Sequence, residues 1–363
     1  MKSIVFGCAV FLFVFQASAQ MDLPPSGGNP RAKITEEVGI TDITISYSRP
    51  DVNKREDSIW GKVVTWGFST SSLITNKNTQ PWRAGANENT TITFEHDVKF
   101  EGHPVKAGTY GIFMAMWPDS VMIILSNQSA AWGSFYYNEK EDALRVIVKP
   151  LKLDKSVEWL KYEFIEQREK YCVIAMQWEK LSVPFRIDVD VDNIVAARLR
   201  DQVNGQKGFN ALLLVSATNY LLNKNIYLED ALNWAQRAAA FRSYSTLRLL
   251  ATAYEKLNRM KEADSVMTDA LTIATINQYV GYGRTMITLK RADRALEIMQ
   301  AGKTKFGDVF AIENGLMFAY SAKGNFKEAQ AAAEKAMSMA TGDAAKKTLE
   351  GQIAKLKESK DVN

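Results

Sequence analysis

The residues best suited to chemistry surround the run Trp82-Arg83-Ala84-Gly85-Ala86-Asn87-Glu88-Asn89-Thr90. An arginine beside a tryptophan can stack on the aromatic face and still offer its planar set of donors to a carboxylate. Asparagine and glutamate before a strand often close a turn by bonding backbone groups. The candidate ligand-binding residues are Arg49, Arg55, Trp82, Arg83, Asn87 and Glu88.

Two interpretations of this set fit the sequence. The residues form either a clamp for an acidic or sugar-like ligand, or an internal network in which the three arginines and Glu88 satisfy one another. Such a network would fix long loops to the end of a β domain, and we favour it. If the loop is instead an enzyme site, Glu88 is the natural general base.

The sequence offers no pattern for a metal ion, a cofactor or an activated nucleophile. Its two histidines, His96 and His103, flank one predicted turn without an HxH or HExxH arrangement. The patterns G-x-S-x-G, G-x-G-x-x-G and G-x-x-x-x-G-K-[ST] do not occur. We therefore predict no metal, no cofactor and no catalytic residues, and lean away from an enzyme.

The length and the charge of the chain limit the classes of protein to which it can belong. A chain of 363 residues is long enough for two domains of roughly 100–200 residues each. The net charge of +4 is small beside 45 basic and 41 acidic residues, and no run of Lys or Arg concentrates it. A nucleic-acid partner is therefore not predicted, because it requires clustered positive charge.

The first residues have the pattern of a secretory signal peptide. Lys2 precedes an apolar run over residues 4–15, and Ala17-Ser18-Ala19 fits a cleavage site. We predict a signal peptide over residues 1–19, a flexible segment over residues 20–28, and export to the periplasm or the extracellular space. The mature chain has no apolar run long enough to span a membrane. It retains only Cys172, which we interpret as a small core hydrophobe.

Residues 29–190 show a period of two that is typical of β-strands. Turn residues separate the candidate strands, as at Glu101-Gly102-His103-Pro104 and Trp117-Pro118-Asp119-Ser120. Many short strands spaced by turns predict an antiparallel β-sandwich or jelly-roll-like domain. The candidate strands cover residues 43–48, 91–94, 113–116, 121–125, 144–148, 162–165 and 172–178.

A helical period replaces the strand period from residue 191. After a predicted linking helix at residues 191–205, Ala231, Ala263, Ala295 and Ala329 recur at intervals of 32, 32 and 34 residues. Residues 206–342 thereby resemble tetratricopeptide repeats, whose period is about 34 residues. Such helix pairs stack into an α-helical solenoid, and we expect a capping helix and tail at residues 343–363. The residues expected to line its groove are Arg248, Thr252, Asn277, Arg284 and Asn314.

Several motifs together resemble a bacterial family known as domain of unknown function 2911. They include Asn29-Pro30-Arg31-Ala32, the run from Trp82 to Thr91, Ala107-Gly108-Thr109-Tyr110-Gly111-Ile112-Phe113, and Trp132-Gly133. The resemblance covers about residues 29–185. It implies an exported protein of Gram-negative type, often with helical repeats appended, and brings no established activity. Residues 65–81, rich in Ser, Thr and Asn, depart from the family as an insertion before Trp82.

The favoured function is an exported binding or scaffold protein whose repeats present a groove to a protein or peptide partner. One alternative is a hydrolase-like enzyme that acts on a glycan or peptide at residues 82–90. Another is a carbohydrate-binding β-sandwich. The sequence leaves the partner and the oligomeric state open.

Overall fold

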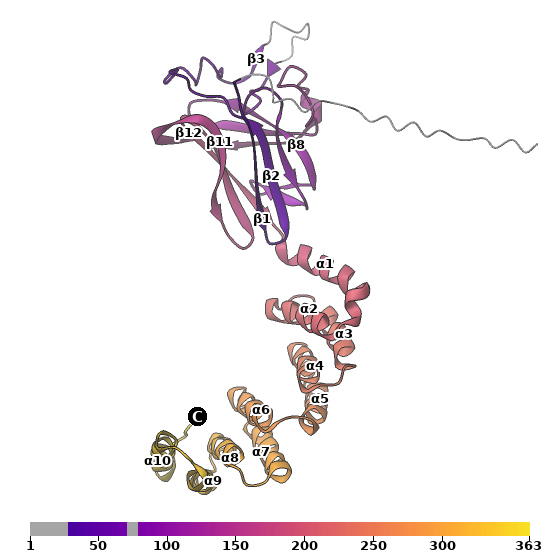
Figure 1. Cartoon of the computed structure of the whole chain (residues 1–363), viewed down its shortest axis with the longest axis vertical. Coiled ribbons are helices and arrows are strands. Elements are labelled where there is room, and N and C mark those ends of the chain that lie inside the picture. Colours follow the sequence, from indigo (N-terminus) through magenta and orange to yellow (C-terminus); the bar gives the residue numbers. More distant parts are fainter. Residues whose placement is uncertain (1–27, 71–78) are drawn as a thin grey trace, which may run out of the picture. The chain divides into compact units, whose positions relative to one another are not determined.

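The computed structural model describes residues 28–70 and 79–363. The predicted signal peptide, nearly all of the segment over residues 20–28, and residues 71–78 of the predicted insertion lie outside the described residues. The chain divides into two compact units, one up to Ile194 and one from Val195 (Figure 1). The boundary therefore falls inside the first helix, α1 (Val191–Asn204).

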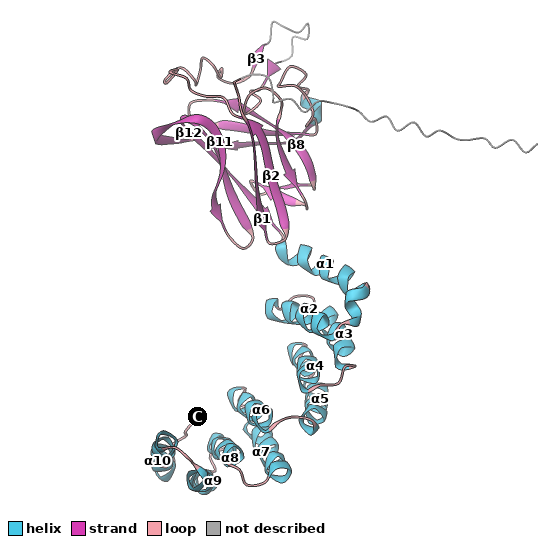
Figure 2. Cartoon of the chain, viewed as in Figure 1, coloured by secondary structure: helices cyan, strands magenta, loops and turns pink. Residues whose placement is uncertain are grey.

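The first unit is built from antiparallel strands (Figure 2). One sheet has six strands in the order β1-β2-β5-β8-β9-β10, a second has four in the order β11-β12-β6-β7, and β3 pairs with β4. The bounds are β1 (Arg31–Val38), β2 (Thr41–Ser48), β3 (Ser69–Thr70), β4 (Thr79–Gln80), β5 (Thr90–Phe94), β6 (Val98–Phe100), β7 (His103–Val105), β8 (Gly108–Met116), β9 (Val121–Ser126), β10 (Asp142–Val148), β11 (Leu151–Gln167) and β12 (Tyr171–Val189).

The two large sheets face each other across a buried core. The ring centroids of Tyr47 on β2 and Tyr162 on β11 lie 4.8 Å apart and edge to face, so side chains of the two sheets meet directly. Along β5 the side chains alternate between buried and half-buried, as the period of two predicts. The predicted antiparallel sandwich is confirmed.

Cys172 lies on β12 and is fully buried. Burial, together with the nearby carboxylates of Glu36 and Asp188, raises the pKa of its thiol to about 12. Because only the thiolate is an effective nucleophile, this cysteine has the properties of a core side chain.

The second unit continues α1 with nine further helices in the described part of the chain, and the predicted helical array is confirmed. Figure 1 shows α2, α4, α6 and α8 along one side of the array and α3, α5, α7 and α9 along the other. The bounds are α2 (Ala211–Lys224), α3 (Leu228–Ala239), α4 (Tyr244–Lys256), α5 (Met260–Thr272), α6 (Ile276–Thr288), α7 (Ala292–Phe306), α8 (Phe310–Ala322), α9 (Phe326–Met339) and α10 (Asp343–Lys357).

Small side chains bring the helices of each pair together. Ala231, Ala263, Ala295 and Ala329 lie on α3, α5, α7 and α9 and are fully buried. Alanine at these positions lets neighbouring helices approach closely, and larger side chains such as Met267 and Tyr282 fill the core between them. Among the described helices, none combines the length and the apolar character needed to cross a bilayer.

Candidate functional site

The loop over residues 82–90 connects β4 with β5 and is tied to both sheets. Trp82 and Met114 of β8 exchange two backbone hydrogen bonds, each 2.8 Å long. The carbonyl of Ala84 accepts hydrogen bonds from the Thr90 hydroxyl at 3.0 Å and from the Tyr162 hydroxyl of β11 at 2.9 Å. Ala84 and Asn87 have positive φ angles of 54° and 57°. These bonds fix the loop as a turn that leads into β5.

The Trp82 ring is part of a cluster of three indoles. It stacks on Trp178 with a centroid distance of 6.0 Å, and Trp60 meets both rings edge-on at 5.8 and 5.7 Å. The Trp82 indole N–H donates to the carbonyl of Gly85 at 3.2 Å. The aromatic face that the sequence offers as a platform is therefore used to pack the loop onto the sandwich.

The other residues of the predicted set bond to separate groups. The Arg49 Nε donates to the carbonyl of Leu160 at 2.9 Å. Arg55 donates to the carbonyl of Val52 and forms an ion pair with Asp51 at 3.4 Å. Glu88 accepts from the hydroxyl of Ser48 at 3.2 Å. The expected mutual Arg–Glu network is therefore wrong, because the bonds of Arg49 and Arg55 go to backbone carbonyl groups and to Asp51, and that of Glu88 goes to Ser48.

Arg83 differs from these residues. Burial lowers the pKa of its guanidinium, and within residues 28–70 and 79–363 no side-chain hydrogen bond or ion pair offsets that burial. The guanidinium packs on Gly133, where an added Cβ would lie 2.5 Å from Arg83 Nη1. Asn87 accepts from the side-chain amide of Asn29 at 3.3 Å. The structure thus does not gather the six predicted residues around one cavity.

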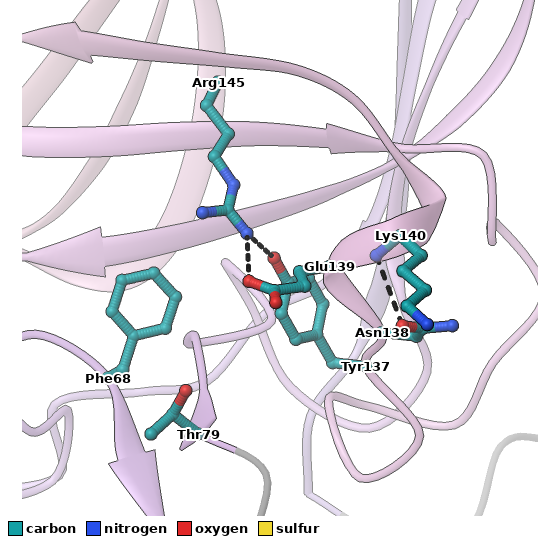
Figure 3. Close-up of a pocket in the computed structure, with 7 residues that line it drawn as sticks. All are labelled: Phe68, Thr79, Tyr137, Asn138, Glu139, Lys140 and Arg145. Carbon is teal, nitrogen blue, oxygen red and sulfur yellow. Dashed lines mark hydrogen bonds and ion pairs between the residues drawn. The ribbon is translucent and has the colours of Figure 1, made fainter.

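A pocket of about 490 Å³ lies elsewhere in the β unit, and the sequence analysis missed it (Figure 3). It is formed by the residue before β3, by β4, by the segment before β10, and by β10 itself. Its signal in the sequence is the aromatic run Phe135-Tyr136-Tyr137 followed by Asn138-Glu139-Lys140. The lining residues are Phe68, Thr79, Tyr137, Asn138, Glu139, Lys140 and Arg145.

Hydrogen bonds connect Arg145, Asp142 and Tyr137 at this pocket. Arg145 Nε donates to Asp142 Oδ2 at 2.6 Å, and Arg145 Nη2 donates to the Tyr137 hydroxyl at 2.9 Å. The Tyr137 hydroxyl donates to the same Asp142 oxygen at 2.7 Å. Burial and the Asp142 carboxylate raise the pKa of Tyr137, so its hydroxyl stays protonated. Figure 3 shows the Arg145 guanidinium directed at the Tyr137 hydroxyl and at the carboxylate of Glu139, which lies 3.5 Å away. The arrangement suits binding of a polar ligand against aromatic rings.

The two histidines lie apart from this pocket. His96 Nδ1 is 3.1 Å from the hydroxyl of Thr41, and His103 begins β7 as an exposed residue. In the described part of the chain, no three His, Cys, Asp or Glu side chains are grouped so that they could hold a metal ion.

The predicted groove residues all lie on the first helix of a pair. Arg248 and Thr252 are on α4, Asn277 and Arg284 on α6, and Asn314 on α8. Arg248 is occupied within the array: it pairs with Glu255 at 3.1 Å and lies 5.2 Å from the ring centre of Tyr282. Thr252 donates to the carbonyl of Arg248. The α4 residues therefore stabilise the array itself.

The α6 and α8 residues leave a more open surface. Arg284 is exposed, and its guanidinium lies 4.4 Å from the ring centre of Phe318. A hollow of about 250 Å³ there is lined by Arg284, Ile287, Thr288, Phe318 and Asn363. We call it the α6–α8 groove. Asn277 lies in a second hollow of about 580 Å³, whose other lining residues are Thr275, Ile276, Val309, Phe310 and Ala311.

Comparisons with known proteins match the two units separately. The family described as "Protein of unknown function (DUF2911)" matches residues 29–187, and a tetratricopeptide repeat matches residues 246–277. A search of curated proteins gave no match.

Several solved structures resemble part of the chain. The crystal structure of MamA is 15% identical, covers 41% of this chain and 88% of its own, and has a TM-score of 0.31. YrrB, described as a TPR protein with an unusual peptide-binding site, is 18% identical over 45% of this chain and 86% of its own, with a TM-score of 0.29. A thermophilic TPR protein of Thermus thermophilus is 18% identical over 46% of this chain and 91% of its own, with a TM-score of 0.29.

The family resemblance predicted from the sequence is therefore confirmed: residues 29–187 match the DUF2911 family, and a match to a tetratricopeptide repeat follows at residues 246–277.

Proposed function

We propose that this protein is an exported binding protein that holds an extended segment of a protein partner in the α6–α8 groove. The observation that carries the proposal is the exposed guanidinium of Arg284. Its guanidinium is exposed and oriented by the Phe318 ring. In the described part of the chain it makes no hydrogen bond and no ion pair. Five N–H donors are thus available to a carboxylate, with the geometry that favours a bidentate contact.

The size of the groove supports a peptide rather than a small-molecule ligand. Pockets that enclose a drug-sized molecule measure roughly 300–1,000 Å³, and the α6–α8 groove measures about 250 Å³. Helical repeats instead bind extended chains along the row of their first helices, with each repeat contributing a few side chains. Arg284 and Phe318 lie on two neighbouring first helices, α6 and α8.

The compartment is also part of the proposal. Lys2, the apolar residues 4–15 and Ala17-Ser18-Ala19 support cleavage after Ala19 and export. These residues lie outside the described residues, so the support comes from the sequence pattern alone. The partner would then be another protein of the cell envelope.

Site-specific cross-linking in cells tests this function. A photo-reactive amino acid at Thr288, within the groove, should give a discrete adduct with a protein partner, and the recovered chain should have the mass of a protein that begins at Gln20. Adding Arg284→Glu should reduce the adduct at least about tenfold, since a hydrogen bond to a charged group contributes about 1.5–3 kcal/mol. The matched control carries the photo-reactive residue at Glu297 on the opposite helix α7. Equal adducts at both positions would contradict a groove partner.

The pocket of the β unit favours a second candidate, binding of a soluble glycan. Trp132 and Tyr136 are 52% and 65% exposed and lie in the segment that leads to the pocket residues Tyr137 and Asn138. Exposed aromatic faces beside polar groups suit sugar rings, because such side chains are apolar with a polar tip. Oligosaccharides of glucose and of N-acetylglucosamine should quench tryptophan fluorescence, and Trp132→Phe should abolish the quenching while Trp159→Phe preserves it. Absence of quenching in the wild type would rule this candidate out.

A further inference from the structure

The segment that follows α10 folds back onto α8. The hydroxyl of Ser321 donates to Asp361 Oδ1 at 2.6 Å and accepts from the backbone N–H of Val362 at 3.0 Å. The side-chain amide of Asn363 donates to the carbonyl of Phe318 at 3.1 Å. Ser321 is itself buried, and its hydroxyl bonds to both Asp361 and Val362. We call residues 361–363 the tail segment.

The tail segment occupies one end of the α6–α8 groove. Asn363 lines the same hollow as Arg284 and Thr288. The side chain of Val362 is half-buried against the core of the helical unit. The segment therefore contacts α8 through a carboxylate and a backbone amide at Ser321, and contacts the helical core through the side chain of Val362. The side-chain amide of Asn363 lines the adjoining groove. These are the kinds of group that an extended peptide presents.

We propose that the tail segment is an internal ligand of the α6–α8 groove, which binds extended segments carrying an acidic residue followed by an apolar one. A partner with that pattern must displace the tail segment, which makes the segment autoinhibitory. This inference rests on the proposed function, since it concerns the same groove. It adds to that function the chemistry of the partner and a means of regulation.

The charges of the groove agree with an acidic ligand. Burial opposes ionisation of Asp361, but hydrogen bonds from Ser321 and Asn363 outweigh it and lower the pKa of the carboxyl group. The Ser321 hydroxyl of α8 thus helps to stabilise the ionised form of Asp361, together with hydrogen bonds from Val362 and Asn363 within the tail segment. A partner that replaces the tail segment would accept the same hydrogen bond from the Ser321 hydroxyl. A second acidic side chain of that partner would accept hydrogen bonds from the guanidinium of Arg284.

Because the tail segment is part of the same chain, it can compete with a free peptide for the groove although it is short. A segment joined to its own site by a short linker experiences an effective concentration on the order of 1 mM. A free peptide that binds the open groove with a Kd of about 0.1 mM would then bind the occupied groove about tenfold more weakly. A weak internal ligand therefore lowers the affinity of a partner by a measurable factor without abolishing binding.

The test uses the tail sequence as its own probe. A fluorescein-labelled peptide with the sequence of residues 358–363, Glu-Ser-Lys-Asp-Val-Asn, is titrated with the full chain and with the same chain carrying Asp361→Gly and Val362→Gly. Fluorescence anisotropy should show that the peptide binds the substituted chain about tenfold more tightly than the wild type. Circular dichroism at 222 nm should be the same for both chains.

Two further variants identify the site of binding. Ser321→Ala, added to the substituted chain, should weaken peptide binding about tenfold, the equivalent of about 1.4 kcal/mol. Ser338→Ala is the matched control, because Ser338 is an exposed serine on α9 whose hydroxyl donates to the carbonyl of Lys335 on the same helix. A probe peptide with asparagine in place of its aspartate should bind the substituted chain more weakly than the original peptide.

Two results would overturn the inference: equal binding of the peptide to the wild type and the substituted chain, or no binding when the substituted chain is raised to about 1 mM, roughly the effective concentration of a tethered segment. The cross-linking experiment tests separately whether the groove binds a partner at all. If the adduct at Thr288 forms equally in the wild type and the substituted chain, the groove binds a partner and the tail segment does not regulate it. If no adduct forms in either chain, the groove function itself fails.

Discussion

Replacing both Lys303 and Lys335 with methionine is expected to lower the free energy of unfolding of the helical unit by about 3–5 kcal/mol. The two lysines lie on α7 and α9 and flank Glu313 of α8, whose side chain is 1% exposed. Lys303 Nζ lies 2.6 Å from the Glu313 carboxylate and Lys335 Nζ lies 3.8 Å from it. Without them a carboxylate remains buried and unpaired, which is far more costly than losing an exposed ion pair.

Asp308 cannot compensate for this loss. It bonds to the same two lysines at 3.1 and 2.9 Å, and those bonds lower the pKa of its carboxyl group to about 2. In the double variant its charge loses both cations as well. Because it is partly exposed to water, this second loss adds less than the stranded charge of Glu313 does.

Urea unfolding followed by circular dichroism at 222 nm measures the effect, since the helices dominate that signal. Adding Glu313→Met to the double variant should recover most of the stability, because a buried ionic cluster can be replaced by apolar side chains of similar volume. Lys323→Met is the control: it breaks a pair with Asp293, whose side chain is 81% exposed, and should leave the free energy of unfolding nearly unchanged because water screens an exposed pair. A double variant no less stable than this control would contradict the expectation.

This cluster matters for the groove because of the helix it fixes. Glu313 is on α8, which also carries Phe318 and Ser321. The lysines connect α8 to its neighbours on both sides, so the cluster holds the helix that presents one wall of the α6–α8 groove. Stability and the position of the proposed site are therefore coupled through the same three side chains.

The sequence predicted the repeats well because their signal is local and periodic. The spacing of Ala231, Ala263, Ala295 and Ala329 follows from the close approach of paired helices, and all four are buried. The five residues predicted to line the groove all lie on first helices. The sequence could not show that Glu255, the last residue but one of α4, neutralises Arg248, nor that residues 361–363 fold back onto Ser321. Such contacts depend on side-chain conformation and on the path of the chain.

The β unit was predicted less completely for a related reason. The hairpin β11–β12 is much longer than the two short candidate strands, because charged residues such as Lys152 and Asp154 interrupt the apolar alternation on its exposed face. The pocket of Figure 3 combines Phe68, Thr79 and Arg145 from three separate segments, and no local pattern joins them. The residues around Trp82 gave a strong local signal, but the partner that decides their role, Trp178, lies far along the chain.

Replacing Trp178 with alanine is accordingly expected to lower the free energy of unfolding of the β unit by about 3–5 kcal/mol, the usual cost of deleting a buried aromatic side chain. Trp178 is 2% exposed and contacts both Trp60 and Trp82. Its loss leaves a cavity beneath the Trp82 ring, and the bonds from Thr90 and Tyr162 to Ala84 are then the main restraint on the loop.

Hydrogen–deuterium exchange of residues 82–90 separates a structural loop from a ligand site. In Trp178→Ala the amides of this loop should exchange at least about tenfold faster, since loss of 1.4 kcal/mol of local stability corresponds to a factor of ten. Trp132→Ala removes an indole that is already half exposed and should change stability by no more than about 0.5 kcal/mol, with the loop amides unchanged. Loop exchange that stays at the wild-type rate in Trp178→Ala would mean that the indole cluster does not hold the loop. Faster exchange would instead establish that the most chemically suggestive stretch of the sequence is built to pack, and that binding is to be sought at the α6–α8 groove and at the pocket beside Arg145.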